Sequence, residues 1–152
     1  MLKFFQHLLQ DARQNISHQN AGTEQLRLTA AALMMEVGQA DFNLDEHELQ
    51  VMREMLDSRF GLTAEQIANL LQIADDQVKE ATDLYHLTAE INQNWSLEEK
   101  FQLYQWLWRV AYADGVLSKH EHHLLRKLSG LLHIPHAEYV RCKIQAHKLH
   151  GS

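Results

Sequence analysis

Apolar residues recur along this chain at intervals of three and four, the spacing that places them on one face of an α-helix. The first such stripe, near the amino end, consists of Leu2, Phe4, Phe5, Leu8 and Leu9. It predicts an amphipathic helix over residues 1–15, which a polar connector ending at Gly22 separates from one domain over residues 23–148. No segment alternates apolar and polar residues between turn signals, so the pattern predicts no strand.

Capping boxes mark the predicted helix starts. In this motif Ser, Thr or Asp is followed three residues later by Glu or Gln, and each side chain accepts a hydrogen bond from the other residue's backbone amide. The motif occurs at Asp45 with Glu48, Thr63 with Gln66, Ser96 with Glu99 and Ser118 with Glu121. Further start signals are Thr23, the pair Asp75 and Asp76, and Pro135. Together they predict an all-α, compact bundle of about seven to eight helices.

The chain resembles itself at a shift of 73 positions. The shift aligns Val37 with Val110, Ala40 with Ala113, Asp41 with Asp114, Leu44 with Leu117, His47 with His120, Glu48 with Glu121 and Arg53 with Arg126. Each copy has the pattern of a helix that ends in Ala-Asp, a short turn, and a second helix that begins with a capping box. We therefore expect an internally duplicated helix-turn-helix unit, with both copies packed as a pseudo-symmetric pair around one core.

The second copy contains Ala113, Asp114 and Gly115 in succession. This segment resembles the Ala-Asp-Gly signature of the TerB-like family, which is named for a bacterial tellurite-resistance protein. The resemblance extends over residues 26–146, and the first copy departs from it with Phe42 in place of the glycine. It implies a helical bundle of bacterial origin with a role in stress response, phage defence or membrane-associated complexes. Similar domains occur at the amino end of membrane-anchored DnaJ-like co-chaperones.

The composition narrows the class of function. A formal charge of -6 and a pI of about 6.0 disfavour nucleic-acid binding, which depends on Lys and Arg that displace counterions from phosphates. The single cysteine, Cys142, excludes an intramolecular disulfide and is typical of a reducing compartment. No apolar run approaches the ~20 residues that span a bilayer, and the amino end lacks the order of a signal peptide. We expect a cytoplasmic protein without direct membrane insertion.

Acidic residues at the two repeat turns are candidate metal ligands. The segment from Asp114 to Glu121 resembles the second half of an EF-hand calcium loop, but Val110 and Tyr112 stand where its first two carboxylates belong. We favour a structural interpretation, in which Glu121 belongs to a capping box and Asp114 holds the turn. The alternative is a weak calcium or magnesium site formed across the pair of copies by Asp41, Asp45, Glu48, Asp114 and Glu121.

Other catalytic or metal-binding patterns are weak. Histidines crowd the second copy at His120, His122, His123, His133 and His136. Without a His-Glu-x-x-His pattern or a partner cysteine, they fit solvated or capping roles better than a metal site. The chain has no nucleophile elbow and no glycine-rich phosphate loop, so we expect no enzyme and no required cofactor.

Three aromatic residues are candidate contacts with a protein partner. Trp106 points away from the helical face that Tyr104 and Trp108 share, so it becomes a natural anchor for a partner if it is exposed. Phe4 and Phe5 lie on the predicted amino-terminal helix, which can dock on the bundle, as we expect by default, bind a partner or rest on a membrane surface.

These observations favour a non-enzymatic interaction module of the tellurite-resistance and stress-response type, with a protein partner in a membrane-associated complex and modulation by a divalent cation. Two alternatives stay open. One is a dedicated divalent-metal-binding protein that uses the paired acidic turns, and the other is a small hydrolase whose site is assembled from residues distant in sequence. The pattern leaves the oligomeric state open.

Overall fold

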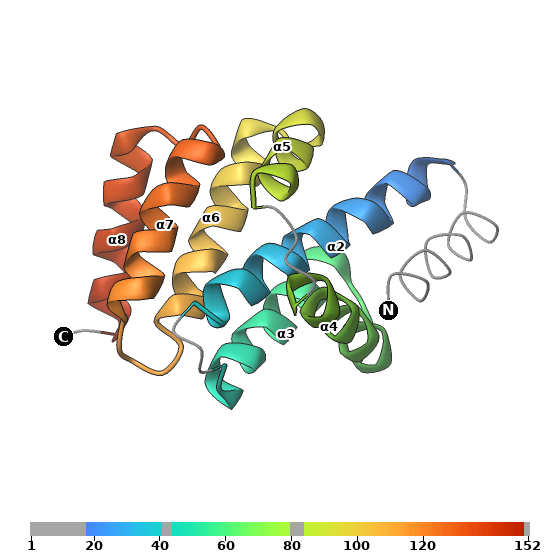
Figure 1. Cartoon of the computed structure of the whole chain (residues 1–152), viewed down its shortest axis with the longest axis horizontal. Coiled ribbons are helices and arrows are strands. Elements are labelled where there is room, and N and C mark those ends of the chain that lie inside the picture. The colour runs from blue at the N-terminus through green and yellow to red at the C-terminus, as the bar shows by residue number, and fades with distance from the viewer. Residues whose placement is uncertain (1–17, 41–43, 80–83, 151–152) are drawn as a thin grey trace.

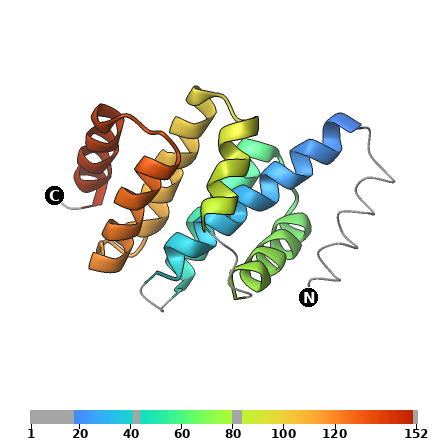
Figure 2. The ribbon, with the colours of Figure 1, turned by 45° about the horizontal axis from the view of Figure 1, so that its top comes forward.

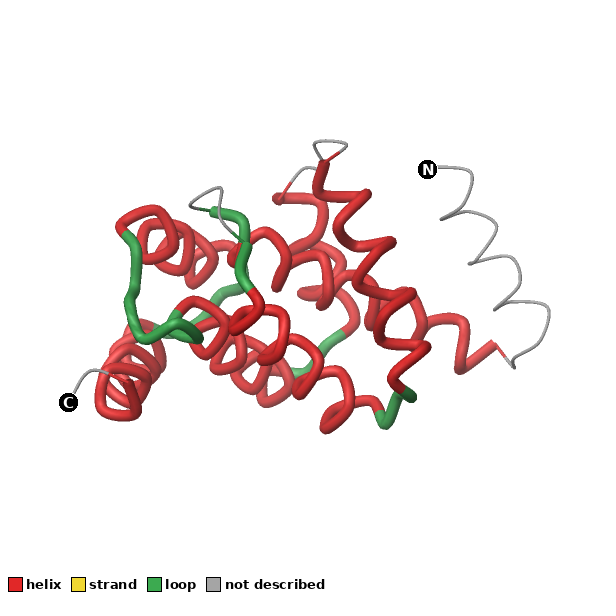
Figure 3. The backbone as a smooth tube through the Cα atoms, turned by 90° about the horizontal axis from the view of Figure 1, so that it is seen from below, coloured by secondary structure: helices red, strands yellow, loops and turns green. Residues whose placement is uncertain are grey.

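A central helix organises the structure, a computed structural model that describes residues 18–40, 44–79 and 84–150. Over this part of the chain there are seven helices: α2 (His18–Gly38), α3 (Glu46–Phe60), α4 (Ala64–Lys79), α5 (Leu84–Asn94), α6 (Leu97–Ala111), α7 (Lys119–Leu131) and α8 (His136–His150). The connections that the structure describes are short loops, and no strand occurs among the described residues (Figure 3). The predicted all-α bundle is confirmed, whereas the helix expected over residues 1–15 lies outside the described residues.

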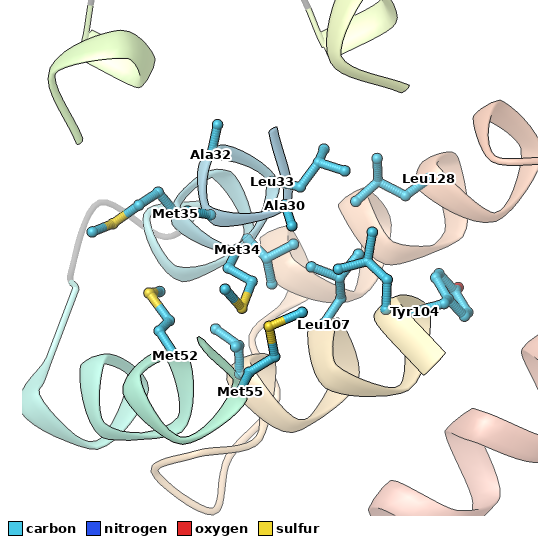
Figure 4. Packing of buried hydrophobic residues seen from close by; sticks show 14 of the residues in the cluster. Ala30, Ala32, Leu33, Met34, Met35, Met52, Met55, Tyr104, Leu107 and Leu128 are labelled. Carbon is cyan, nitrogen blue, oxygen red and sulfur yellow. The ribbon is translucent and has the colours of Figure 1, made fainter. Parts of the chain in front are cut away.

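Helix α2 crosses the middle of the bundle and packs against α3, α4, α5, α6 and α7 (Figure 1). Its residues 28–35 are buried without a break, so neighbours cover this stretch on every face. Methionine side chains from two helices, Met34 of α2 with Met52 and Met55 of α3, fill the space on one side (Figure 4). Because methionine is flexible and unbranched, it adapts to the irregular gaps between helices that cross at different angles.

All four predicted capping boxes are present. At the start of α6, Ser96 Oγ accepts from the amide of Glu99 at 3.1 Å and Glu99 Oε1 accepts from the amide of Ser96 at 2.9 Å. Before α4, Thr63 and Gln66 exchange the same two bonds at 3.2 and 2.9 Å. Both partners of the motif lie within four residues, so the local sequence suffices to form it.

The predicted start of α2 is wrong. The helix begins at His18, so Gly22 and Thr23 lie inside it rather than at its amino end. A glycine within a helix costs only about 1 kcal/mol. Burial of the apolar residues further along α2 offsets that cost, because each large apolar side chain removed from water contributes roughly 1.5–3 kcal/mol.

The helix expected to start at Asp75 and Asp76 does not begin there. Both residues lie in the last two turns of α4, and α5 begins at Leu84. Asp75 forms an ion pair with Lys79 at 3.0 Å, one turn further along the same helix. Acidic residues can thus stabilise the end of a helix through pairs at this spacing, and an acidic dipeptide alone does not define a start.

The turn between α6 and α7 explains why the signature contains glycine. Gly115 has φ of 86°, a left-handed conformation that other residues adopt at a cost. The preceding Asp114 closes the turn, because its Oδ1 accepts from the amide of Val116 at 3.0 Å. The corresponding turn of the first copy, with Asp41 and Phe42, lies outside the described residues.

None of the described helices combines the length and the apolar content needed to cross a membrane.

Candidate functional site

Two glutamates that belong to capping boxes are buried. Glu48 Oε1 accepts from the amide of Asp45 at 3.1 Å, while Asp45 Oδ1 accepts from the amide of Glu48 at 2.9 Å. Ser118 and Glu121 exchange the equivalent bonds at 3.0 and 3.1 Å at the start of α7. A glutamate in a capping box normally faces water, yet Glu48 and Glu121 are each only 2% exposed. The capping interpretation of both residues is confirmed, and their burial requires a further explanation.

The two buried glutamates meet across the internal repeat. They occupy equivalent positions of the two copies, and the side chain of Glu121 is a hydrogen-bonding neighbour of the side chain of Glu48. Burial raises the pKa of Glu48 well above its ordinary value, and the charges of Glu121 and Asp45 raise it further. The bond from the Asp45 amide lowers the pKa but does not overcome the burial.

One oxygen of this pair lacks a hydrogen-bond donor. Glu48 Oε2 is buried and no N–H or O–H group of the structure donates to it. Its acidic neighbour Glu121 can donate to it only when the carboxyl group of Glu121 is protonated. Gly38 at the end of α2 lies close by, since a Cβ there would be 3.6 Å from Glu48 Oε2 and 2.7 Å from Met52 Cε. Glu48 Oε2 therefore lies against the end of α2, and the pair can satisfy it by holding a proton or a cation.

The structure brings together only part of the predicted metal set. Glu48 and Glu121 form the pair, and Asp45 lies close enough to Glu48 to raise its pKa. Asp114 is exposed and is occupied by the turn that it closes, while Asp41 lies outside the described residues. Within the described ranges, no group of three His, Cys, Asp or Glu side chains is placed to hold a metal ion together.

The histidines of the second copy are dispersed around α7. His122 Nε2 lies 3.0 Å from the hydroxyl of Tyr139, and partial burial lowers the pKa of His122, with Lys143 and Arg126 lowering it further. His120 and His123 are exposed on the same helix. His133 ends the helix in a left-handed conformation with φ of 58°. The exposure of His120 and His123 agrees with the solvated role expected for them, whereas His122 is half-buried against Tyr139.

Trp106 is half-buried. It packs against the core, and the guanidinium of Arg109 lies 4.0 Å from the centre of its ring. Arg109 also reaches Glu54 of α3 at 3.8 Å, so the ring lies under a charged pair that links α6 to α3. A role of Trp106 in partner binding stays a prediction, as does that of Phe4 and Phe5, which lie outside the described residues.

Helix α8 carries a second apolar stripe, which the sequence pattern did not distinguish as a candidate site. Ala137 and Ile144 are exposed, Ile144 to 51%, and Val140 between them is half-buried because it also packs against the core. The signal was present in the spacing of these residues, but the neighbouring Tyr139, Cys142 and Ala146 have a similar spacing. Only the structure shows which stripe is covered by the bundle.

The fold and the buried pair define a class of protein: an all-α bundle of duplicated helix-turn-helix units joined by their capping-box glutamates. The family model described as Tellurite resistance protein TerB matches residues 27–144. This chain therefore belongs to the TerB family, as its Ala-Asp-Gly signature indicated. No curated protein and no solved structure gives a significant match.

Proposed function

We propose that this TerB-family chain is a non-enzymatic interaction module of the tellurite-resistance and stress-response type, in which a divalent cation at Glu48 and Glu121 modulates binding to a protein partner. The buried carboxylate pair carries this proposal. Two acidic side chains of 2% exposure repel one another strongly when both are charged. A bound cation removes that repulsion and supplies the partner that Glu48 Oε2 lacks.

The position of the pair supports a modulating role. Glu48 belongs to the first turn of α3 and Glu121 to the first turn of α7, and these are the second helices of the two copies. An ion held between them ties the copies together, and its loss loosens the same junction. Calcium and magnesium both take carboxylate oxygens as ligands, so both fit the chemistry of the pair.

Thermal melting of metal-stripped protein tests the cation. Calcium or magnesium at about a hundred times its Kd should stabilise the protein by about 2.7 kcal/mol, or ~5–10 °C at the 2–4 °C per kcal/mol expected for this size. Glu48→Gln and Glu121→Gln should abolish the rise. Glu98→Gln, at an exposed acid in the first turn of α6, is the matched control and should retain it. Identical melts with and without ions would exclude the cation and leave a shared proton on the pair.

A dedicated metal-binding protein is the second candidate, and the same unpartnered oxygen favours it. The two candidates differ in whether the chain binds a protein partner in an ion-dependent way. The immobilised chain is incubated with an extract of its source cells in the presence of magnesium or of a chelator. An interaction module retains a stoichiometric protein partner with magnesium, and Glu48→Gln releases that partner. An ion-dependent melt without any ion-dependent partner favours the metal-binding protein instead.

A further inference from the structure

Helix α8 has two apolar faces, of which one is covered and the other is covered only in part, at Val140. It lies at one end of the bundle and packs against α6 and α7 (Figure 2). Tyr139, Cys142 and Ala146 form the covered face and are nearly inaccessible to water. A helix at the edge of a bundle normally presents polar residues on its other side.

The partly covered face of α8 is a shallow apolar groove. Its volume is about 550 Å³, and it is lined by Ala137, Val140, Arg141, Ile144, Gln145 and Lys148. We call this surface the α8 groove. Its apolar residues recur at intervals of three and four, so they form a straight line along the helix that a second helix can follow.

Charge in this chain is segregated by position. Residues 119–152 contain six lysines and arginines against two acidic residues, a formal charge of +4, whereas residues 1–118 carry -10. The two acidic residues of the carboxyl-terminal segment, Glu121 and Glu138, are both buried. The lining of the α8 groove contains Arg141 and Lys148 and no acidic residue, on a protein that is acidic as a whole, so an anionic partner is electrostatically complementary to it.

One cation of the groove is already positioned. Glu138 is 9% exposed and holds the guanidinium of Arg141 through two hydrogen bonds of 2.9 and 2.6 Å. The side chain of Arg141 is nevertheless 59% exposed, so the guanidinium keeps donors that can reach a carboxylate outside the molecule. Fixing such a side chain before association reduces the entropy lost on binding.

We propose that the α8 groove is the docking surface for an amphipathic helix of the partner protein, with apolar residues that pack on Val140 and Ile144 and with carboxylates that pair with Arg141 and Lys148. This deepens the proposed interaction role and rests on it. A second copy of this chain fits less well, because α8 against α8 brings like charges together. A lipid surface also fits less well, because the groove offers no aromatic residue or leucine to insert.

Two designed peptides test the proposal by fluorescence anisotropy. The first is an amphipathic helix with a leucine stripe flanked by glutamates, and the second has the same leucines flanked by lysines. The glutamate peptide should bind and the lysine peptide should not. Ile144→Glu and Lys148→Glu should each weaken binding at least ~tenfold, which corresponds to 1.4 kcal/mol. Leu97→Glu is the control, since Leu97 is equally exposed at 52% but lies at the start of α6.

Several results would overturn the docking proposal. Equal binding of both peptides, no binding of either, or an unchanged affinity of Ile144→Glu each contradict it. Binding to anionic vesicles that needs Ile144, without peptide binding, assigns the groove to a membrane surface. Self-association that is detected by sedimentation and abolished by Ile144→Glu assigns the groove to a second copy.

Repeating the peptide titration with magnesium, and with the Glu48→Gln variant, separates the docking proposal from the proposed cation modulation. If neither magnesium nor Glu48→Gln changes the affinity for the peptide, cation modulation is overturned and the docking surface is retained.

Discussion

At the scale of single residues, Glu48 makes stability depend on pH. Its folded-state pKa lies above the unfolded value of 4.5, at about 9, so the folded protein keeps a proton that the unfolded chain releases. The contribution of Glu48 to the free energy of unfolding is then fully present below pH 4.5. It declines as the pH rises from 4.5 towards about 9, by up to about 1.4 kcal/mol for each pH unit. Paired carboxyl groups that share one proton behave in this way in other proteins.

Replacing Glu48 with glutamine should flatten this pH dependence, because glutamine offers a similar shape and never ionises. We expect Glu48→Gln to exceed the wild type in the free energy of unfolding at about pH 8 in metal-free buffer, and the difference to shrink towards about pH 5. Urea denaturation at several pH values measures it. Glu98→Gln, at an exposed site, should keep the wild-type slope; equal slopes for Glu48→Gln would show that the proton is not held there.

Gly115 provides a second test at the scale of residues. Its φ of 86° is strained for any residue with a Cβ, although open space surrounds the position. Gly115→Ala should therefore destabilise the protein by about 1 kcal/mol. Gly130 lies inside α7 and is also surrounded by open space, so Gly130→Ala should instead raise the free energy of unfolding by roughly 0.5–1 kcal/mol. Thermal melts of the two variants that shift in the same direction would contradict the backbone explanation.

At the scale of helices, the capping box of α7 contributes to stability. Ser118→Ala removes the acceptor for the amide of Glu121 and should cost about 1 kcal/mol in the free energy of unfolding. Ser118→Thr keeps an acceptor and should retain most of that stability. Chemical denaturation monitored by circular dichroism compares them. If Ser118→Thr lowers the free energy of unfolding as much as Ser118→Ala does, the loss comes from altered packing and not from the missing capping bond.

Helix starts were predictable where the sequence alone contains the interaction. The four capping boxes formed as expected because each joins two residues of the same turn. The start of α2 at His18 and the position of Asp75 inside α4 were not predictable, since the length of a helix also depends on packing further along it and on pairs such as Asp75 with Lys79. The repeat aligned Glu48 with Glu121, but their burial depends on how α3 and α7 pack, which no local pattern contains.

At the scale of the whole molecule, the two copies of the repeat share one core. Helix α2 of the first copy packs against α5, α6 and α7 as well as against α3 and α4. Leu33 and Met34 of α2 lie in the same buried cluster as Leu107 of α6 and Leu128 of α7 (Figure 4). Neither copy can therefore separate without exposing apolar surface of the other, and we expect both to unfold in one cooperative transition.

The tryptophans allow this cooperativity to be measured, because all three lie between Trp95 and Trp108, outside the first copy. Met52→Ala removes a fully buried side chain from α3 and should cost roughly 2–5 kcal/mol. If the copies unfold together, tryptophan fluorescence must report the same loss as circular dichroism, although no tryptophan lies on α3. Glu65→Ala, at an exposed site of α4, should change either signal by less than about 0.5 kcal/mol. A fluorescence midpoint that stays at the wild-type value while the dichroism midpoint falls would mean that the second copy is stable on its own, and that the pair of glutamates joins two folding units rather than lying inside one.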